Sequence, residues 1–186
     1  MNLPSRTDAL KILDKWVKNP NLKKHMLAVE GVMRSYAKIF KEDEEYWGQV
    51  GLLHDFDYER YPVLKDHPFK GVEELKRLGY PENFLKAILA HAEHTGEPRN
   101  TLLKKAIFAV DELSGFIIAV ALVRPTKKLS EVNIEAVMKK LKEKSFASKI
   151  NREEIFKSAQ ELGIEFSEHI NNVLNSLKSI HSELGL

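Results

Sequence analysis

The stretch YWGQVGLLHDFD, residues 46–57, determines how this chain is organised. Apolar residues lead up to the adjacent pair His54 and Asp55, and imidazole and carboxylate groups both bind divalent transition metals. Neighbouring side chains on a helix point about 100° apart, so this pair can bind one ion only at a helix end or with residues from other helices. The residues that we expect to help are His25, His67, His91 and Asp111.

Composition limits the kinds of protein that this chain can be. Its 186 residues are enough for one domain with a substantial core. The net charge of +2 is spread along the chain, so no basic block indicates binding to nucleic acid. There are no cysteines, which excludes disulfides, thiolate metal sites and a cysteine nucleophile. Any transition metal must therefore be held by imidazole and carboxylate groups.

Hydropathy gives no indication of a membrane protein. The longest apolar run, residues 106–123, is interrupted by Asp111 and Glu112, which fits a buried helix better than a membrane span. The N-terminal residues lack the long uncharged stretch of a signal peptide. We therefore expect a cytoplasmic protein that binds no membrane.

Helical periodicity dominates and predicts an all-α fold. A loop over residues 56–66 follows the His-Asp pair, and Pro81 begins a helix that carries both His91 and His94 on one face. We expect one domain over residues 1–186, with a metal-binding core at 20–125 and a C-terminal helical extension at 126–186 packed on it. The other expected helices cover residues 5–18, 22–40, 43–54, 67–79, 101–123, 130–143, 151–162 and 166–184.

The candidate ligands divide into two sets. One set, which has two imidazoles and two carboxylates, would make a single site with open positions for water; it consists of His25, His54, Asp55 and Asp111. With His67 and His91 a second ion becomes possible, and Asp55 would bridge the two ions. These donors suit Mn, Fe, Ni, Co or Zn without choosing among them. Because such ions lower the pKa of bound water and neutralise phosphoryl oxygens, the chemistry that we expect is hydrolysis.

The pattern H-x28-HD-x11-H-x23-H-x19-D on a helical chain resembles the HD-domain superfamily of metal-dependent phosphohydrolases. The resemblance covers roughly residues 20–125. HPFKGVEEL (67–75) is similar to the HPxxGAxxL segment of the HDIG-type branch. ILAHAEHTGEPR (88–99) and LLKKAIFAVDELSG (102–115) resemble the region of its later histidine and final aspartate. The tail after about residue 125 matches no motif of the family.

The resemblance implies roles for particular residues. His25, His54, Asp55 and Asp111 would hold one metal, and His67 and His91 a second one, with Asp55 in the catalytic position. The family's HDIGK reads HDFDY here, so Asp57 stands in place of glycine and Tyr58 in place of lysine. The adjacent His-His of the cyclic-dinucleotide branch reads His91-Ala92, and His94 could substitute one turn later.

Each candidate also has a structural alternative. His67 could cap its helix beside Pro68, and Asp111 could lie at a helix edge beside a lysine, although an unpaired carboxylate in such an apolar helix would be costly. Because the family's lysine is absent, we expect Arg60 to contact the phosphate, and Arg124 to reach a distal part of a long substrate. His94 is a further residue that we expect to contact the substrate. His169 and His181 lie in a polar tail, and we expect both at the surface.

These observations predict an all-α, single-domain phosphohydrolase that uses one or two divalent transition metal ions. Its partner would be a small phosphorylated substrate such as a nucleotide, attacked at phosphorus by metal-activated water. Binding to nucleic acid is not expected, and a homodimer is left open. Two alternatives remain: an HD-type di-iron oxygenase, and a module that senses a nucleotide without turnover.

Overall fold

The computed structural model describes residues 3–186, and within them the chain is helical throughout and has no β-strand. This confirms the all-α prediction. The elements are α1 (Arg6–Trp16), α2 (Pro20–Phe40), α3 (Glu44–Leu53), α4 (Phe69–Arg77), α5 (Glu82–Ala90), η1 (Glu93–Thr95), α6 (Leu102–Leu122), η2 (Leu129–Glu131), α7 (Ile134–Lys142), α8 (Arg152–Leu162), α9 (Phe166–Ser179) and α10 (His181–Leu184).

Short polar side chains start most of the long helices. Asn19 accepts hydrogen bonds from the backbone N–H groups of Asn21 and Leu22, and Pro20 occupies the first turn of α2, where a missing N–H costs nothing. Asp43 caps α3, and Thr101 caps α6. The two helices that carry the first and last candidate ligands, α2 and α6, therefore begin where the sequence places a cap.

The helices α2 and α3 form a hairpin whose backbones come into direct contact. A Cβ atom added to Gly51 would lie 2.8 Å from the carbonyl oxygen of Val29, so only glycine permits this approach. Val29 is one turn after His25, and Gly51 is three residues before His54. The close approach therefore brings these two histidines to the same place, and their ring centroids are 5.2 Å apart.

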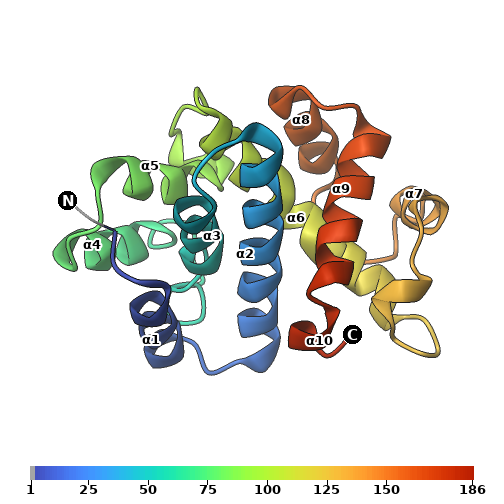
Figure 1. Cartoon of the computed structure of the whole chain (residues 1–186), viewed down its shortest axis with the longest axis horizontal. Helices are drawn as coiled ribbons and strands as arrows, with labels where there is room; N and C mark the ends of the chain where they lie inside the picture. The colour runs from blue at the N-terminus through green and yellow to red at the C-terminus, as the bar shows by residue number, and fades with distance from the viewer. Residues whose placement is uncertain (1–2) are drawn as a thin grey trace.

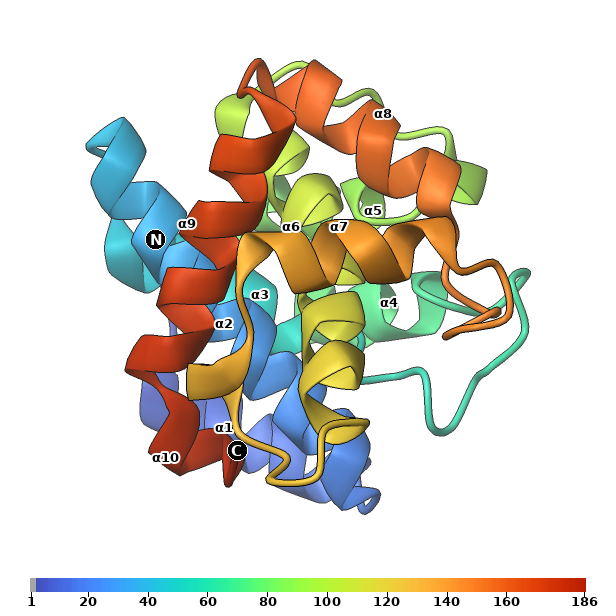
Figure 2. The same ribbon diagram turned by 90° about the vertical axis from the view of Figure 1, so that its right-hand side faces the viewer.

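Helix α6 connects the two halves of the fold. In Figure 1 it passes between the N-terminal helices, drawn in blue to green, and the C-terminal helices, drawn in orange and red. It packs against α2, α3 and α5 on one side and against α7, α8 and α9 on the other. The view in Figure 2 shows α7 and α8 in front of it. A residue in the middle of α6, such as Asp111, can therefore face groups from both halves.

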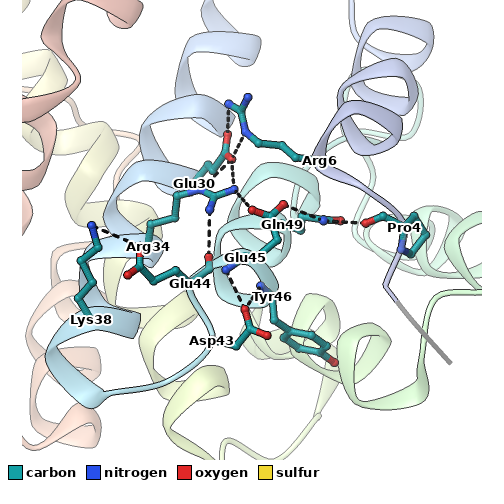
Figure 3. Close-up of polar contacts among 10 residues, drawn as sticks. All are labelled: Pro4, Arg6, Glu30, Arg34, Lys38, Asp43, Glu44, Glu45, Tyr46 and Gln49. Atoms are coloured by element: carbon teal, nitrogen blue, oxygen red, sulfur yellow. Dashed lines mark hydrogen bonds and ion pairs between the residues drawn. The ribbon is translucent and has the colours of Figure 1, made fainter.

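A buried ion pair ties the first three helices together, as Figure 3 shows. Glu30 of α2 is only 3% exposed, and its carboxylate accepts hydrogen bonds from Arg6 of α1 at 2.6 and 2.9 Å. Arg34 also donates to Glu30, at 3.0 Å, and to Glu45 of α3 at 2.9 Å. A buried carboxylate needs such partners, because an unpaired one is strongly destabilising.

Several helix boundaries differ from the prediction. The helix expected over 130–143 begins only at Ile134, after η2. The helix α5 ends at Ala90, and Ala92 has an extended backbone, so His91 and His94 do not share a helix face as predicted; His94 lies in η1. The expected helix over 166–184 is interrupted at Ile180. Pro68 precedes α4 instead of lying in its first turn. At Ala92 and Ile180 non-helical backbone interrupts a pattern that continues in the sequence.

The prediction that His169 lies at the surface is wrong. Its side chain is fully buried, because α9 turns it toward α2 and α6. One ring nitrogen pairs with the hydroxyl of Tyr36, and the other donates to the carbonyl of Ala109 at 3.0 Å. His181 is exposed as predicted. In the described chain, no helix combines the length and apolar character that a membrane crossing requires.

Candidate metal centre

His54 lies at the C-terminal end of α3, where its ring is directed into the protein and is completely buried. Its Nδ1–H donates to the carbonyl of Gly51 at 2.8 Å, so Nε2 is the ring nitrogen that is left for another partner. Nε2 has no hydrogen-bond partner, although it lies 3.3 Å from Asp111 and 3.7 Å from Asp55. A buried imidazole nitrogen without a hydrogen-bond partner, set between two carboxylates, has the chemistry of a metal ligand.

The rings of His67 and His91 are oriented in the same way. The Nδ1–H of His91 donates to the carbonyl of Ile88 at 2.6 Å, and that of His67 donates to the carboxylate of Asp57 at 2.7 Å. Both rings therefore direct Nε2 at Asp55. A hydrogen bond on the outer nitrogen fixes the tautomer and raises the basicity of the inner one, as is usual for metal-binding histidines.

Two groups of residues are close enough to hold an ion each. The first consists of His25, His54 and Asp55, and the second of Asp55, His67 and His91; in each group the ligand atoms lie within 4.8 Å of one another. Asp111 adjoins the first group, since its Oδ1 is 3.0 Å from Nε2 of His25. The six candidate ligands that the sequence indicated are thus brought together from five separate parts of the chain.

Asp55 belongs to both groups and uses a different oxygen for each. Its Oδ1 lies 3.2 Å from Nε2 of His67 and 3.2 Å from Nε2 of His91. Its Oδ2 faces His54. A carboxylate with its two oxygens directed at two sets of imidazoles has the geometry to bridge two ions.

Electrostatics at this position favour a cation. Burial opposes the charged form of His54, but Asp55 and Asp111 outweigh it and raise the pKa of His54 to about 9. For His67, Asp55 and Asp57 likewise outweigh burial and raise the pKa to about 9. Burial alone would raise the pKa of the Asp55 carboxyl, yet the neighbouring imidazoles hold that pKa well below its usual value. Divalent ions can supply the same positive charge, and they would then replace protons on these rings.

The two groups open into a cavity of about 540 Å³. Tyr58, Leu64 and Ile150 form apolar parts of its wall, and Glu93, Glu112 and Glu154 add three further carboxylates. Burial, and then the charge of Asp111, raise the pKa of Glu112 to about 8, and the charge of Glu154 adds to this effect. The cavity therefore combines a floor of candidate metal ligands with an acidic wall.

Comparison with known proteins agrees with this geometry. The family model described as HD domain matches residues 22–115, which are more than half of the chain. The chain belongs to the HD-domain family. No curated protein and no solved structure matches it. The matched segment includes every candidate ligand from His25 to Asp111, and α7 to α10 follow it as a C-terminal addition to the HD domain.

The arginines expected to contact phosphate lie outside the cavity of this HD domain. Arg60 donates to the carbonyls of Lys15 and Trp16 at 2.6 and 3.3 Å and stacks on the Trp16 ring, so its guanidinium faces α1. Arg124 follows the end of α6, roughly 20 Å along the helix from Asp111. Neither residue lines the cavity. The placement of Arg60 thus does not support the role that we expected for it.

His94 does line the cavity, but one of its ring nitrogens is already engaged. Its Nε2 bonds to the backbone carbonyl of His67 at 2.8 Å. The ring also meets Phe69 edge to face, with centroids 6.1 Å apart. The contact with His67 indicates that His94 helps to position a candidate ligand, and its place on the wall is compatible with the substrate contact expected from the sequence.

In the sequence, Asp57 stands out only as a departure from the family pattern. Its carboxylate is buried and accepts hydrogen bonds from Nδ1–H of His67 and from the backbone N–H of Gly71, the latter at 2.7 Å. A Cβ at Gly71 would lie 2.9 Å from Cγ of Asp57, so glycine is needed there. An extra aspartate two residues after the His-Asp pair was a usable signal for a residue that orients a ligand.

Proposed function

We propose that this protein is a metal-dependent phosphohydrolase that cleaves a small phosphate ester or anhydride, a class that includes nucleotides. The observation that carries the proposal is the sharing of Asp55 between two sets of imidazoles at the floor of one cavity. Two ions held a few Å apart can together stabilise the attacking and leaving oxygens of a displacement at phosphorus. Membership of the HD-domain family supports the same reaction class.

The reaction is a hydrolysis whose atoms balance without another reactant. The oxygen of water forms a bond to phosphorus while the bond from phosphorus to the ester oxygen breaks. One proton of the water goes to the leaving oxygen, which departs as an alcohol, and the other stays with the phosphate. When bound, divalent ions lower the pKa of water and neutralise charge on the phosphoryl oxygens.

The chain's own residues position these parts. The hydrogen bonds of His54, His67 and His91 to fixed acceptors hold the ring nitrogens in place before any ion binds. Tyr58 and Leu64 lie at the cavity wall, where they would exclude water from a bound ester. No side chain has to act as a nucleophile, because the water attacks phosphorus directly.

Metal restoration tests the proposal. The purified protein is stripped with a chelator, reloaded separately with Mn, Fe, Co, Ni or Zn, and assayed for phosphate release from monoesters, nucleotides and diesters. We expect release with at least one ion, and a loss of about 100-fold or more in Asp55→Asn, because both ion sites lose a ligand. Asp14→Asn is the control, since Asp14 is an exposed residue of α1.

Two results would contradict the proposal. One is full activity of metal-free Asp55→Asn. The other is an intact, metal-loaded protein that releases phosphate from no substrate but consumes oxygen with iron, which would favour an oxygenase.

A further inference from the structure

The wall of the cavity above the candidate ligands is acidic. Glu93, Glu112 and Glu154 line it, and within the described residues 3–186 its lining includes neither lysine nor arginine. Glu93 is neutralised elsewhere, because Lys157 and Arg99 pair with it. No lysine or arginine of the described chain forms an ion pair with Glu112 or Glu154. These two carboxylates are therefore free to meet a bound molecule.

Glu154 is held in position by its own helix and comes from outside the matched HD segment. It lies in the first turn of α8, where Asn151 donates a hydrogen bond to Oε1 at 2.7 Å. The helix α8 packs on α6, which carries Glu112. Ile150, just before α8, lines the same cavity. The C-terminal helices thus complete one side of a cavity whose floor belongs to the HD segment of residues 22–115.

Charge limits what can bind between these carboxylates and the metal centre. Two divalent ions would bring four positive charges to the centre, where the ligands Asp55 and Asp111 supply two negative ones. A phosphoryl group can be satisfied at the ions, but the remaining part of the substrate would then face Glu112 and Glu154. A second anionic group there would be repelled, whereas an ammonium group would form charge-assisted hydrogen bonds.

The completely buried Nε2 of His54, which has no partner, points to ligand binding at the metal centre, and other members of that centre, such as Asp55 and Asp111, line this cavity. The acidic wall therefore adjoins a metal centre for which the unpartnered Nε2 is separate evidence of ligand binding.

We propose that Glu154, with Glu112 beside it, selects phosphate monoesters whose alcohol part carries an ammonium group, such as aminoalkyl phosphates. This inference rests on the proposed phosphohydrolase function and narrows its substrate class. Glu154 acts on specificity and takes no part in the displacement at phosphorus. Among phosphorylated compounds, those with a second phosphate at the distal end would be poor substrates.

The test compares three esters of similar size: 2-aminoethyl phosphate, propyl phosphate and carboxymethyl phosphate. With the metal-loaded protein we expect kcat/KM for the ammonium ester to exceed that for propyl phosphate by about tenfold or more, the effect of one charge-assisted hydrogen bond. Carboxymethyl phosphate should be the poorest of the three. Glu154→Gln should reduce the ratio of kcat/KM for the ammonium ester to kcat/KM for propyl phosphate several-fold.

Charge reversal gives a stronger test. Glu154→Lys should invert the order, so that carboxymethyl phosphate becomes better than 2-aminoethyl phosphate. The control is Glu153→Gln, because Glu153 precedes Glu154 in α8 but is exposed and does not line the cavity. It should keep the preference of the unaltered protein. Metal content and circular dichroism of each variant check that the centre and the fold are intact.

The outcomes separate the two proposals. Equal kcat/KM for all three esters, or a preference that Glu154→Lys does not alter, would overturn the specificity inference and leave the hydrolase function standing. Phosphate release from none of these esters and from none of the nucleotides would overturn the proposed function and this inference together. A preference for the ammonium ester that is lost in Glu154→Gln and inverted in Glu154→Lys is the supporting result.

Discussion

The carboxylate of Asp57 accepts a hydrogen bond from Nδ1 of His67 at 2.7 Å, and this contact decides which nitrogen of His67 faces Asp55. The second oxygen of Asp57 accepts a hydrogen bond from the backbone N–H of Gly71, so the orientation of the carboxylate is itself fixed. A candidate ligand, a residue that orients it and the start of a helix are thus connected in one buried chain of contacts.

Replacement of Asp57 should therefore weaken one metal site selectively. In Asp57→Asn the amide accepts less strongly from the imidazole, so we expect the affinity for the ion bound by His67 and His91 to fall about 10- to 100-fold. The affinity at His25 and His54 should change little. Metal titration followed by calorimetry measures both sites, with Glu73→Gln on the exposed face of α4 as control. An equal loss at both sites would show that Asp57 supports the fold and not one ligand.

The division of ligands into two groups predicts different stoichiometries for single substitutions. The unaltered protein should bind two ions, the second more weakly. His25→Ala and His91→Ala should each bind one, because each lies in a single group, whereas Asp55→Ala should lose most binding at both. Elemental analysis after equilibrium dialysis gives the numbers, and exposed His181→Ala is the control. Saturation at one ion per chain, unchanged in His91→Ala, would contradict this arrangement.

The candidate ligands could be found from the sequence because burial and spacing constrain them strongly. Asp111 lies in a helix of apolar residues, where a carboxylate requires a partner, and His54-Asp55 ends another apolar stretch. Helix positions were also predictable, since caps such as Asn19 and Thr101 precede regular apolar stripes. These features depend on local sequence and on the cost of burying charge.

The direction of a side chain in a loop could not be predicted in this way. Arg60 is five residues from Asp55, which is near enough to reach the site, but Trp16 and the end of α1 provide a cation–π contact and two carbonyls on the other side. Glu154 comes from a distant helix, so only tertiary packing places it at the cavity. His169, by contrast, lies four residues before Val173 and eight before Leu177, so its position on the apolar stripe was readable.

The Glu30 network predicts a large difference between two glutamates that are both visible in Figure 3. Glu30→Gln leaves Arg6 and Arg34 without a buried counter-charge and should lower the free energy of unfolding by about 1–3 kcal/mol. Glu44→Gln removes only an exposed pair with Lys38, 3.3 Å apart, and should cost below about 1 kcal/mol. Urea denaturation followed by circular dichroism measures both. Equal effects would show that Glu30 contributes no more than a surface residue.

The buried ring of His169 predicts a dependence of stability on pH. Burial lowers the pKa of His169 to about 4, whereas an unfolded histidine has a pKa of about 6.5. Between these values the unfolded chain binds a proton that the folded chain does not, so the free energy of unfolding falls as the pH decreases from 6.5 toward 4. The loss from this residue should approach about 3 kcal/mol at the lower end.

In His169→Gln, whose amide can still donate and accept, the difference in unfolding free energy between pH 7 and pH 4.5 should shrink by a measurable part of that amount, whatever the variant's absolute stability. The exposed His181→Gln should retain the full difference, because its ring keeps contact with water in both states. Urea denaturation of the unaltered protein and the two variants at both pH values makes the comparison. If the free energy of unfolding changed equally with pH in all three proteins, His169 would accept a proton in the fold as readily as in the unfolded chain.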